Sequence, residues 1–249
     1  MSEKLTRKEI KQDDRFHNSL VELSNWVTVH KKRLTTAGVT IVVIILAGFI
    51  WSFFSQKRYE ESMSAYTKAL QESQAEESAF EAQLLEKKKK GEKAPAQLSK
   101  DVVIANEIMR LTDVAKKYTR TEAAFYSKFK IAQLYYELGK FHEAQAYYNE
   151  IVDSAPNEFT EALVLYGLGY SEESLERYEQ ASKAFESVVS RDIPFFSASA
   201  LLGKGRCLEK LNRLDDAKKA YEEVQRRWPN SPLAKTSEQY LSLVGSLPK

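Results

Sequence analysis

The sequence predicts an all-α protein in which a single N-terminal transmembrane helix precedes an α-solenoid of helix pairs. Glycine and proline are scarce, at nine and six of 249 residues, whereas turn-rich β-sandwiches need many such breaks. Residues 34–54 form an apolar run without a single charge. The last half of the chain repeats itself at intervals of 36 and 37 residues, a period typical of helical solenoids.

Residues 1–33 are expected to form a cytoplasmic tail with a short amphipathic helix. Apolar side chains recur there at helical spacings of four, three and four residues, at Phe16, Leu20, Leu23 and Val27. Asp13 or Asp14 is expected to cap the start of this helix. We expect the helix to lie on the membrane surface with its apolar side towards lipid. The alternative is a docking site for a cytoplasmic or membrane-bound partner.

Residues 34–54 are predicted to be the transmembrane helix. At 1.5 Å per residue such a helix is about 31 Å long, which matches a hydrocarbon core of about 30 Å. A buried core helix of this length would normally carry a polar stripe, and this run has none. Trp51 and neighbouring phenylalanines stand at one end, where interfacial aromatics belong. No small-x-small cleavage site follows, so the run is predicted to be an uncleaved anchor rather than a signal peptide.

The distribution of lysine and arginine predicts the orientation. Within fifteen residues of the run each side has three such residues, so the near flanks do not decide. The whole tail holds eight, against four in the 33 residues after the run. The positive-inside rule therefore favours a single-pass protein of the bacterial inner (plasma) membrane, with a cytoplasmic N-terminus and an extracytoplasmic, periplasmic repeat domain.

Residues 55–122 are expected to hold a long membrane-proximal helix, a lysine-rich loop and a degenerate repeat. The helix shows an apolar stripe at Tyr59, Met63, Tyr66 and Leu70, which resumes at Phe80 and Leu84. Residues 86–100 read EKKKKGEKAPAQLSK, a composition that predicts a solvated loop. A second helix of the degenerate repeat is then indicated by Ile108, Leu111, Val114 and Ala115.

Residues 123–249 contain three self-similar segments and a final helix that caps them. The segments align on Ala144, Ala181 and Ala217. An aromatic residue follows each alanine by four positions, at Tyr148, Phe185 and Tyr221, and a small residue precedes it by twelve, at Ala132, Gly169 and Gly205. Small residues let two helices approach closely, the aromatic ring fills the gap to the next unit, and the prolines Pro156, Pro194 and Pro229 are expected to end the second helices. The capping helix is indicated by Leu233, Tyr240, Leu241 and Val244.

This pattern resembles the tetratricopeptide repeat (TPR), a helix-turn-helix unit with a family period of 34 residues. The tyrosine that the family places on the first helix is present as Tyr135 and is replaced by Glu172 and Leu208. The resemblance implies that partners bind on the concave face, which the first helices build. The implied partner-binding groove comprises Phe129, Gln133, Tyr136, Glu137, Tyr166, Tyr170, Glu173, Arg206, Glu209 and Lys210. The alternative is that some of these tyrosines only pack between helices.

Other classes of function find no support in the sequence. Residues 59–249 carry 27 lysines and arginines against 30 acidic residues, which disfavours nucleic-acid binding. The histidines His17, His30 and His142 lie far apart in the sequence, so their spacing does not suit a zinc site. The sequence also has no glycine-rich loop of the kind that binds phosphate. We expect no catalytic residue, no cofactor and no metal, and therefore not an enzyme. The single cysteine, Cys207, is expected to be a buried apolar residue.

The layout of basic tail, single span and degenerate repeats resembles that of the YfgM-like family of bacterial inner-membrane proteins. Members of that family are ancillary subunits of the Sec translocon and contact periplasmic chaperones. The resemblance implies a membrane-anchored protein-protein interaction scaffold, whose partners are a membrane complex, extracytoplasmic chaperones or their clients. Two alternatives stay open. One is a scaffold of cell-envelope assembly, in division or outer-membrane biogenesis, and the other is a regulatory subunit of a membrane enzyme.

Overall fold

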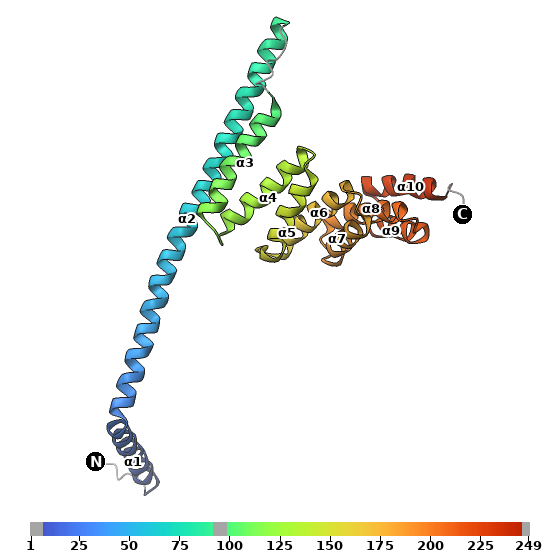
Figure 1. Cartoon of the computed structure of the whole chain (residues 1–249). Helices are drawn as coiled ribbons and strands as arrows, with labels where there is room; N and C mark the ends of the chain where they lie inside the picture. The colour runs from blue at the N-terminus through green and yellow to red at the C-terminus, as the bar shows by residue number, and fades with distance from the viewer. Residues whose placement is uncertain (1–6, 92–98, 246–249) are drawn as a thin grey trace, which may run out of the picture. The chain divides into compact units, whose positions relative to one another are not determined.

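The computed structural model describes residues 7–91 and 99–245, with side chains described from residue 17 onward except at residues 194 and 195. Every regular element in these ranges is a helix (Figure 1). The elements are α1 (Arg7–Val29), α2 (Lys31–Lys90), α3 (Lys100–Lys117), α4 (Glu122–Glu137), α5 (Phe141–Ile151), the short 3-10 helix η1 (Val152–Ser154), α6 (Glu158–Ser174), α7 (Tyr178–Ser190), α8 (Pro194–Lys210), α9 (Leu214–Arg227) and α10 (Pro232–Gly245).

The chain divides into two compact units, residues 1–58 and residues 59–249. The first unit holds α1 and the beginning of α2. α1 is 23 residues long and begins at Arg7, so Asp13 and Asp14 lie inside it and the predicted capping role is wrong. The reason is that residues 7–12, RKEIKQ, include several good helix formers and no breaker. The side chain of Phe16 lies outside the described part, whereas Leu20, Leu23 and Val27 are solvent-exposed.

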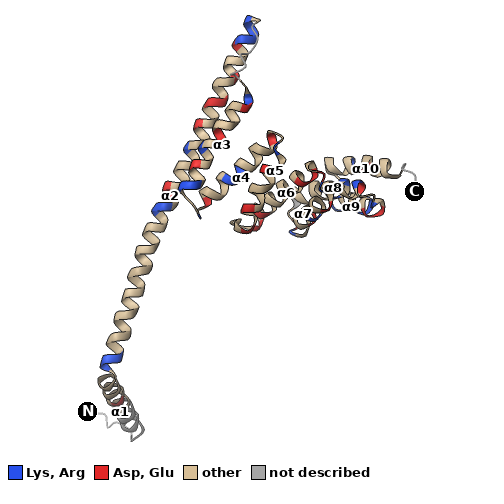
Figure 2. Ribbon diagram, in the orientation of Figure 1, with Lys and Arg blue, Asp and Glu red and all other residues tan. Residues whose placement is uncertain are grey.

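The apolar run lies within α2, and no side chain in it is covered by the rest of the described chain. Figure 2 shows this stretch as the long part of α2 without charged residues, between the basic groups at its two ends. By length and composition α2 is a candidate membrane span.

The second unit begins with a helix pair made by the later part of α2 and α3. Ala69 of α2 shares a core with Leu111 and Val114 of α3, and this core continues into α4. Arg110 of α3 donates a hydrogen bond of 2.6 Å to the carboxylate of Glu76 in α2, which adds a charge-assisted bond to the apolar contact. The later part of α2 and α3 therefore form a helix pair in the region where a degenerate repeat was predicted.

α2 and α3 both extend into residues 86–100, where a loop was predicted. α2 continues to Lys90, so its last turn carries Lys87, Lys88, Lys89 and Lys90. Positive side chains are favourable at this end because the helix dipole places partial negative charge there. α3 begins directly after Ser99, whose hydroxyl oxygen accepts a hydrogen bond from the backbone N–H of Asp101. Pro95 and its neighbours Ala94 and Ala96 lie among residues 92–98, outside the described part.

From α4 to α10 the helices form a stack of antiparallel pairs, in which each helix packs on the next (Figure 1). The three aligned alanines are completely buried, as the repeat pattern predicted. Phe185 of α7 fills the space between two repeats. A Cβ atom on Gly169 in α6 or on Gly203 in α8 would lie 2.7 Å from its ring, so only glycine permits this approach from both sides.

The turn inside each repeat has the same hydrogen bonding in all three pairs. In each turn, one residue after the first helix has a positive φ angle. These residues are Gly139 (69°), Glu176 (59°) and Asn212 (58°). The next backbone N–H then donates to a carbonyl five residues earlier, as Lys140 does to Tyr135 over 2.9 Å, which is a Schellman-type helix end. Between repeats the prolines differ. Pro156 and Pro229 follow second helices, but Pro194 opens α8, because proline fits the first helical position.

Candidate protein-binding face

The first helices of the three pairs, α4, α6 and α8, form one continuous surface. α6 contacts α4 and α8 directly, in addition to the second helices α5 and α7 that flank it. Among the described residues the second helices have no comparable contact with one another. The solenoid therefore brings its first helices together. We call the surface of α4, α6 and α8 the first-helix face.

Two tyrosines of α6 lie at the middle of this face. The rings of Tyr166 and Tyr170 meet edge to face at 4.8 Å, and their hydroxyl oxygens are 3.1 Å apart. Each is half-buried, because Tyr170 packs on Phe185 at 5.2 Å and Tyr166 packs on Phe196 at 5.6 Å. Each tyrosine therefore has one side packed against the core and another side open to solvent, and its part in partner binding stays a prediction.

Phe159 extends this aromatic group and was missed by the sequence analysis. Its side chain is 51% exposed, and its ring lies 5.4 Å from Phe196. It precedes Tyr166 by seven residues, which places both on the same face of α6. That spacing was visible in the sequence, but Phe159 lies in the first turn of α6, before the positions that the repeat alignment covered. An exposed phenylalanine beside half-buried aromatics is typical of a binding surface.

α4 contributes the predicted positions of the first repeat. Phe129 packs against Tyr148 with ring centres 6.0 Å apart. The hydroxyl of Tyr136 lies 3.3 Å from that of Ser174, which links α4 to α6. Gln133 and Glu137 are exposed, and the carboxylate of Glu137 accepts a hydrogen bond of 2.5 Å from Lys100 of α3. Of these four positions, Gln133 is the polar one most open to a partner.

The charged end of the face is organised around Arg206 of α8. Its guanidinium donates two hydrogen bonds of 2.8 Å to Glu173 of α6 and lies 5.8 Å from the ring centre of Tyr170. Burial and the hydrogen bond shared with Tyr166 raise the pKa of Tyr170, so its hydroxyl stays protonated. Glu209 instead accepts a hydrogen bond of 2.5 Å from Tyr221 of α9, which engages it inside the third repeat. Lys210 is exposed at the end of α8.

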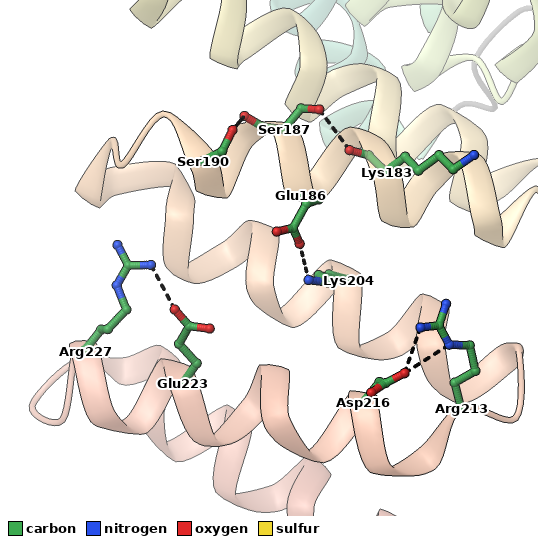
Figure 3. A network of polar contacts seen from close by, with 9 residues as sticks. All are labelled: Lys183, Glu186, Ser187, Ser190, Lys204, Arg213, Asp216, Glu223 and Arg227. Carbon is green, nitrogen blue, oxygen red and sulfur yellow. Dashed lines mark hydrogen bonds and ion pairs between the residues drawn. The ribbon is translucent and has the colours of Figure 1, made fainter.

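Two clefts on the side of the second helices are filled by paired charges. One, of about 370 Å³, lies between α7 and α9 above α8, and Figure 3 shows its ion pairs. Lys204 pairs with Glu186 across α8 and α7, and Arg213 pairs with Asp216 at 2.7 Å. The other, of about 250 Å³, includes the pair of Lys128 with Glu150 at 2.7 Å. The pairs Lys204–Glu186 and Lys128–Glu150 each join two neighbouring helices, whereas Arg213 and Asp216 lie three residues apart at the start of α9.

No constellation suited to catalysis stands out in the described part of the chain. No group of three or more histidine, cysteine or acidic side chains within it is placed to hold a metal ion. Burial, with a smaller contribution from the charge of Glu173, raises the pKa of the Cys207 thiol to about 12. This thiol is completely buried and protonated at neutral pH, so it is a packing residue rather than a nucleophile.

Two segments of the chain match a known family of helical repeats. Residues 126–158 and 166–232 match models of the tetratricopeptide repeat. TPR-like repeats of a kinesin light chain from Podosopora anserina are 15% identical, with a TM-score of 0.51 over 58% of this chain and 78% of that chain. MamA from Desulfovibrio magneticus RS-1 is 16% identical, with a TM-score of 0.49 over 57% and 74%. The search among curated proteins found no relative. The chain therefore contains tetratricopeptide repeats, which are protein-interaction modules.

Proposed function

We propose that this protein is a membrane-anchored scaffold, in which α2 crosses a bilayer once and the tetratricopeptide domain binds other proteins on the first-helix face. One observation carries the proposal: a single helix, α2, contains an uncovered, uncharged run of membrane-spanning length and then enters the core of a repeat domain. Such a run exposes isoleucine, valine and phenylalanine side chains on all sides. That surface is unfavourable in water and favourable in a bilayer.

The first-helix face supplies the binding surface in this proposal. Phe159, Tyr166 and Tyr170 offer a contiguous aromatic area, and Tyr166 and Tyr170 are already held by packing. A preorganised aromatic side chain loses little conformational entropy when a partner binds, which is why aromatics dominate binding hot spots. The ion pair of Arg206 with Glu173 sets a polar boundary at the far end.

The excess of lysine and arginine in the tail supports a cytoplasmic N-terminus and an extracytoplasmic repeat domain. Together with the resemblance of the layout to YfgM-like proteins, this favours an ancillary subunit that links the protein-export machinery to extracytoplasmic chaperones or clients. The proposal assigns no catalytic residue, cofactor or metal to the chain.

Site-specific photocrosslinking in native membranes tests this function. A benzoylphenylalanine at position 159 replaces an exposed phenylalanine of the face, and the same residue at Lys183, exposed on α7, is the matched control. We expect translocon subunits or periplasmic chaperones to crosslink at 159 and not at 183. Crosslinks at 159 to division or outer-membrane assembly proteins, or to one membrane enzyme, would replace the export role by one of the two alternatives. Equal crosslinking at both positions would refute the binding face.

A further inference from the structure

An open depression lies on α2 where the apolar run begins. It has a volume of about 580 Å³ and is lined by Lys32, Arg33, Thr36, Ala37, Thr40 and Ile41. These positions recur every four residues and share one face of the helix. The cations stand at one end of the depression, and apolar side chains follow them into the uncharged run. The surface thus changes from positive to apolar over about two helical turns.

The positive charge at this end has no compensation in the described part of the first unit. Lys31, Lys32 and Arg33 are consecutive, and the nearest acidic residue before them is Glu22. None of the three pairs with a carboxylate among residues 17–58. At the other end of the run, by contrast, the basic pair 57–58 is closely followed by Glu60 and Glu61. The two ends of the apolar run therefore differ in net charge, and only the first presents an anion-attracting surface.

The hydroxyl groups inside the depression are already satisfied. The hydroxyl of Thr36 donates to the carbonyl of Lys32 at 2.7 Å, and that of Thr40 donates to the carbonyl of Thr36 at 2.9 Å. Neither hydroxyl needs water, so both tolerate contact with hydrocarbon. The free donors are the Lys32 ammonium and the Arg33 guanidinium. A ligand with an anionic head and an apolar tail matches this order of groups.

α1 provides a second observation that points to a lipid surface. Trp26 is 52% exposed, and its indole stacks on His30 at 4.8 Å, directly before the cations. Leu23 and Val27 are exposed on the same helix. Tryptophan beside basic residues at the end of an apolar run is the composition found at the headgroup level of membranes. A partner protein of acidic character would not account for the exposed apolar side of α1.

We propose that this depression binds the phosphate group of an anionic phospholipid, an inference that rests on the proposed membrane anchor. The Arg33 guanidinium donates two parallel hydrogen bonds to the phosphate oxygens, and the Lys32 ammonium adds a second charge. The acyl chain follows Ala37 and Ile41 along α2. The site selects lipids with net negative charge, because a zwitterionic headgroup brings its own cation to a surface that is already positive.

Native mass spectrometry of the full chain, released from mixed micelles of phosphatidylglycerol and phosphatidylcholine, tests the site. We expect wild-type protein to retain phosphatidylglycerol preferentially. The K32Q/R33Q variant should lose this preference about 30-fold, since each cation near an anionic lipid strengthens binding about fivefold. The K57Q/R58Q variant removes the same charge from the other end of the run and should stay within about twofold of wild type.

Either of two results with the variants would overturn the lipid site: an unchanged preference for phosphatidylglycerol in K32Q/R33Q, or an equal loss of that preference in K57Q/R58Q. A third result, with the wild type, would reject the site in favour of an acidic protein partner: displacement of phosphatidylglycerol by an excess of a poly-glutamate peptide. Flotation of the same proteins with liposomes of pure phosphatidylcholine distinguishes the absence of the lipid site from the absence of the membrane anchor. A chain that floats but shows no lipid preference lacks only the site, whereas a chain that does not float lacks the membrane anchor.

Discussion

Arg206 of α8 and Glu173 of α6 form a two-pronged ion pair, with both hydrogen bonds at 2.8 Å, across two first helices of neighbouring repeats. The side chains are 29% and 21% exposed, so the pair is partly shielded from water. It joins the two helices on the face where we place partner binding. The pair therefore connects the stability of the solenoid to the shape of its binding surface.

Replacing one member of this ion pair should lower the free energy of unfolding more than replacing both members. R206M leaves the carboxylate of Glu173 half-buried without its partner, and we expect a loss of about 2 kcal/mol, less than for a fully buried pair. The double variant R206M/E173M should recover at least half of that loss. Urea unfolding of the full chain in detergent measures both. Equal destabilisation by the single and the double variant would show that the pair contributes through packing alone.

Gly203→Ala should destabilise the solenoid by roughly 1–3 kcal/mol, because the new methyl group overlaps the Phe185 ring. Gly169 confines the same ring from the other side, so the ring cannot simply move away. Replacing the Phe185 ring by the smaller leucine side chain relieves the overlap. Gly203→Ala should therefore destabilise the protein clearly less in a Phe185→Leu background. Thermal melts of the wild type, the two single variants and the double variant form a double-mutant cycle that measures this coupling. Additive effects of the two changes would contradict the proposed contact.

Glu176→Gly is expected to stabilise the protein by about 1 kcal/mol, because Glu176 adopts positive φ in the turn of the second repeat and glycine does so without strain. For a domain of this size that raises the melting temperature by about 2–4 °C. Asn212 occupies the equivalent position in the third repeat, and asparagine tolerates this conformation. Asn212→Gly should consequently give the smaller rise, and a larger rise than that of Glu176→Gly would contradict the explanation.

Phe159→Ala should weaken partner binding while leaving stability almost unchanged. The side chain is half exposed and contacts only the edge of the aromatic group, so the melting temperature should fall by less than about 2 °C. A hot-spot truncation costs about 2 kcal/mol in affinity, which is roughly a 30-fold loss in quantitative pull-downs. Tyr166→Ala should lower both binding and stability, because Tyr166 also packs on Phe185 and Phe196. If Phe159→Ala destabilises the domain as much as Tyr166→Ala and leaves binding intact, Phe159 belongs to the core.

The repeat architecture was predictable because its packing rules act at fixed sequence spacings. A buried alanine, an aromatic four residues later and a small residue on the facing helix recur in register, and the structure confirms the contacts of Gly169 with Phe185 and of Gly205 with Tyr221. The end of α2 was predicted less well. A lysine run reads as solvated loop, yet it also suits the last turn of a helix, and composition does not separate the two.

The candidate site was predictable only in part. The first-helix face was implied by the resemblance to the tetratricopeptide repeat. Helical spacing does not reveal which charges pair across helices. Arg206 and Glu173 are 33 residues apart, and Glu209 reaches Tyr221 of the following helix. Such contacts depend on how neighbouring helices pack, which no local pattern encodes. The binding role of the predicted residues stays a prediction until a partner is identified.

Thiol labelling in spheroplasts tests the central claim, which is that the chain has a single membrane anchor and an extracytoplasmic repeat domain. The native Cys207 is buried and unreactive, so a cysteine introduced at exposed Lys235 or Ser24 gives the only signal expected from a folded chain. We predict that a membrane-impermeant maleimide labels Lys235→Cys in intact spheroplasts and Ser24→Cys only after lysis, with both proteins retained in membranes at alkaline pH. Labelling of Ser24→Cys and protection of Lys235→Cys before lysis would contradict the orientation, and release of the protein at alkaline pH would contradict the anchor itself.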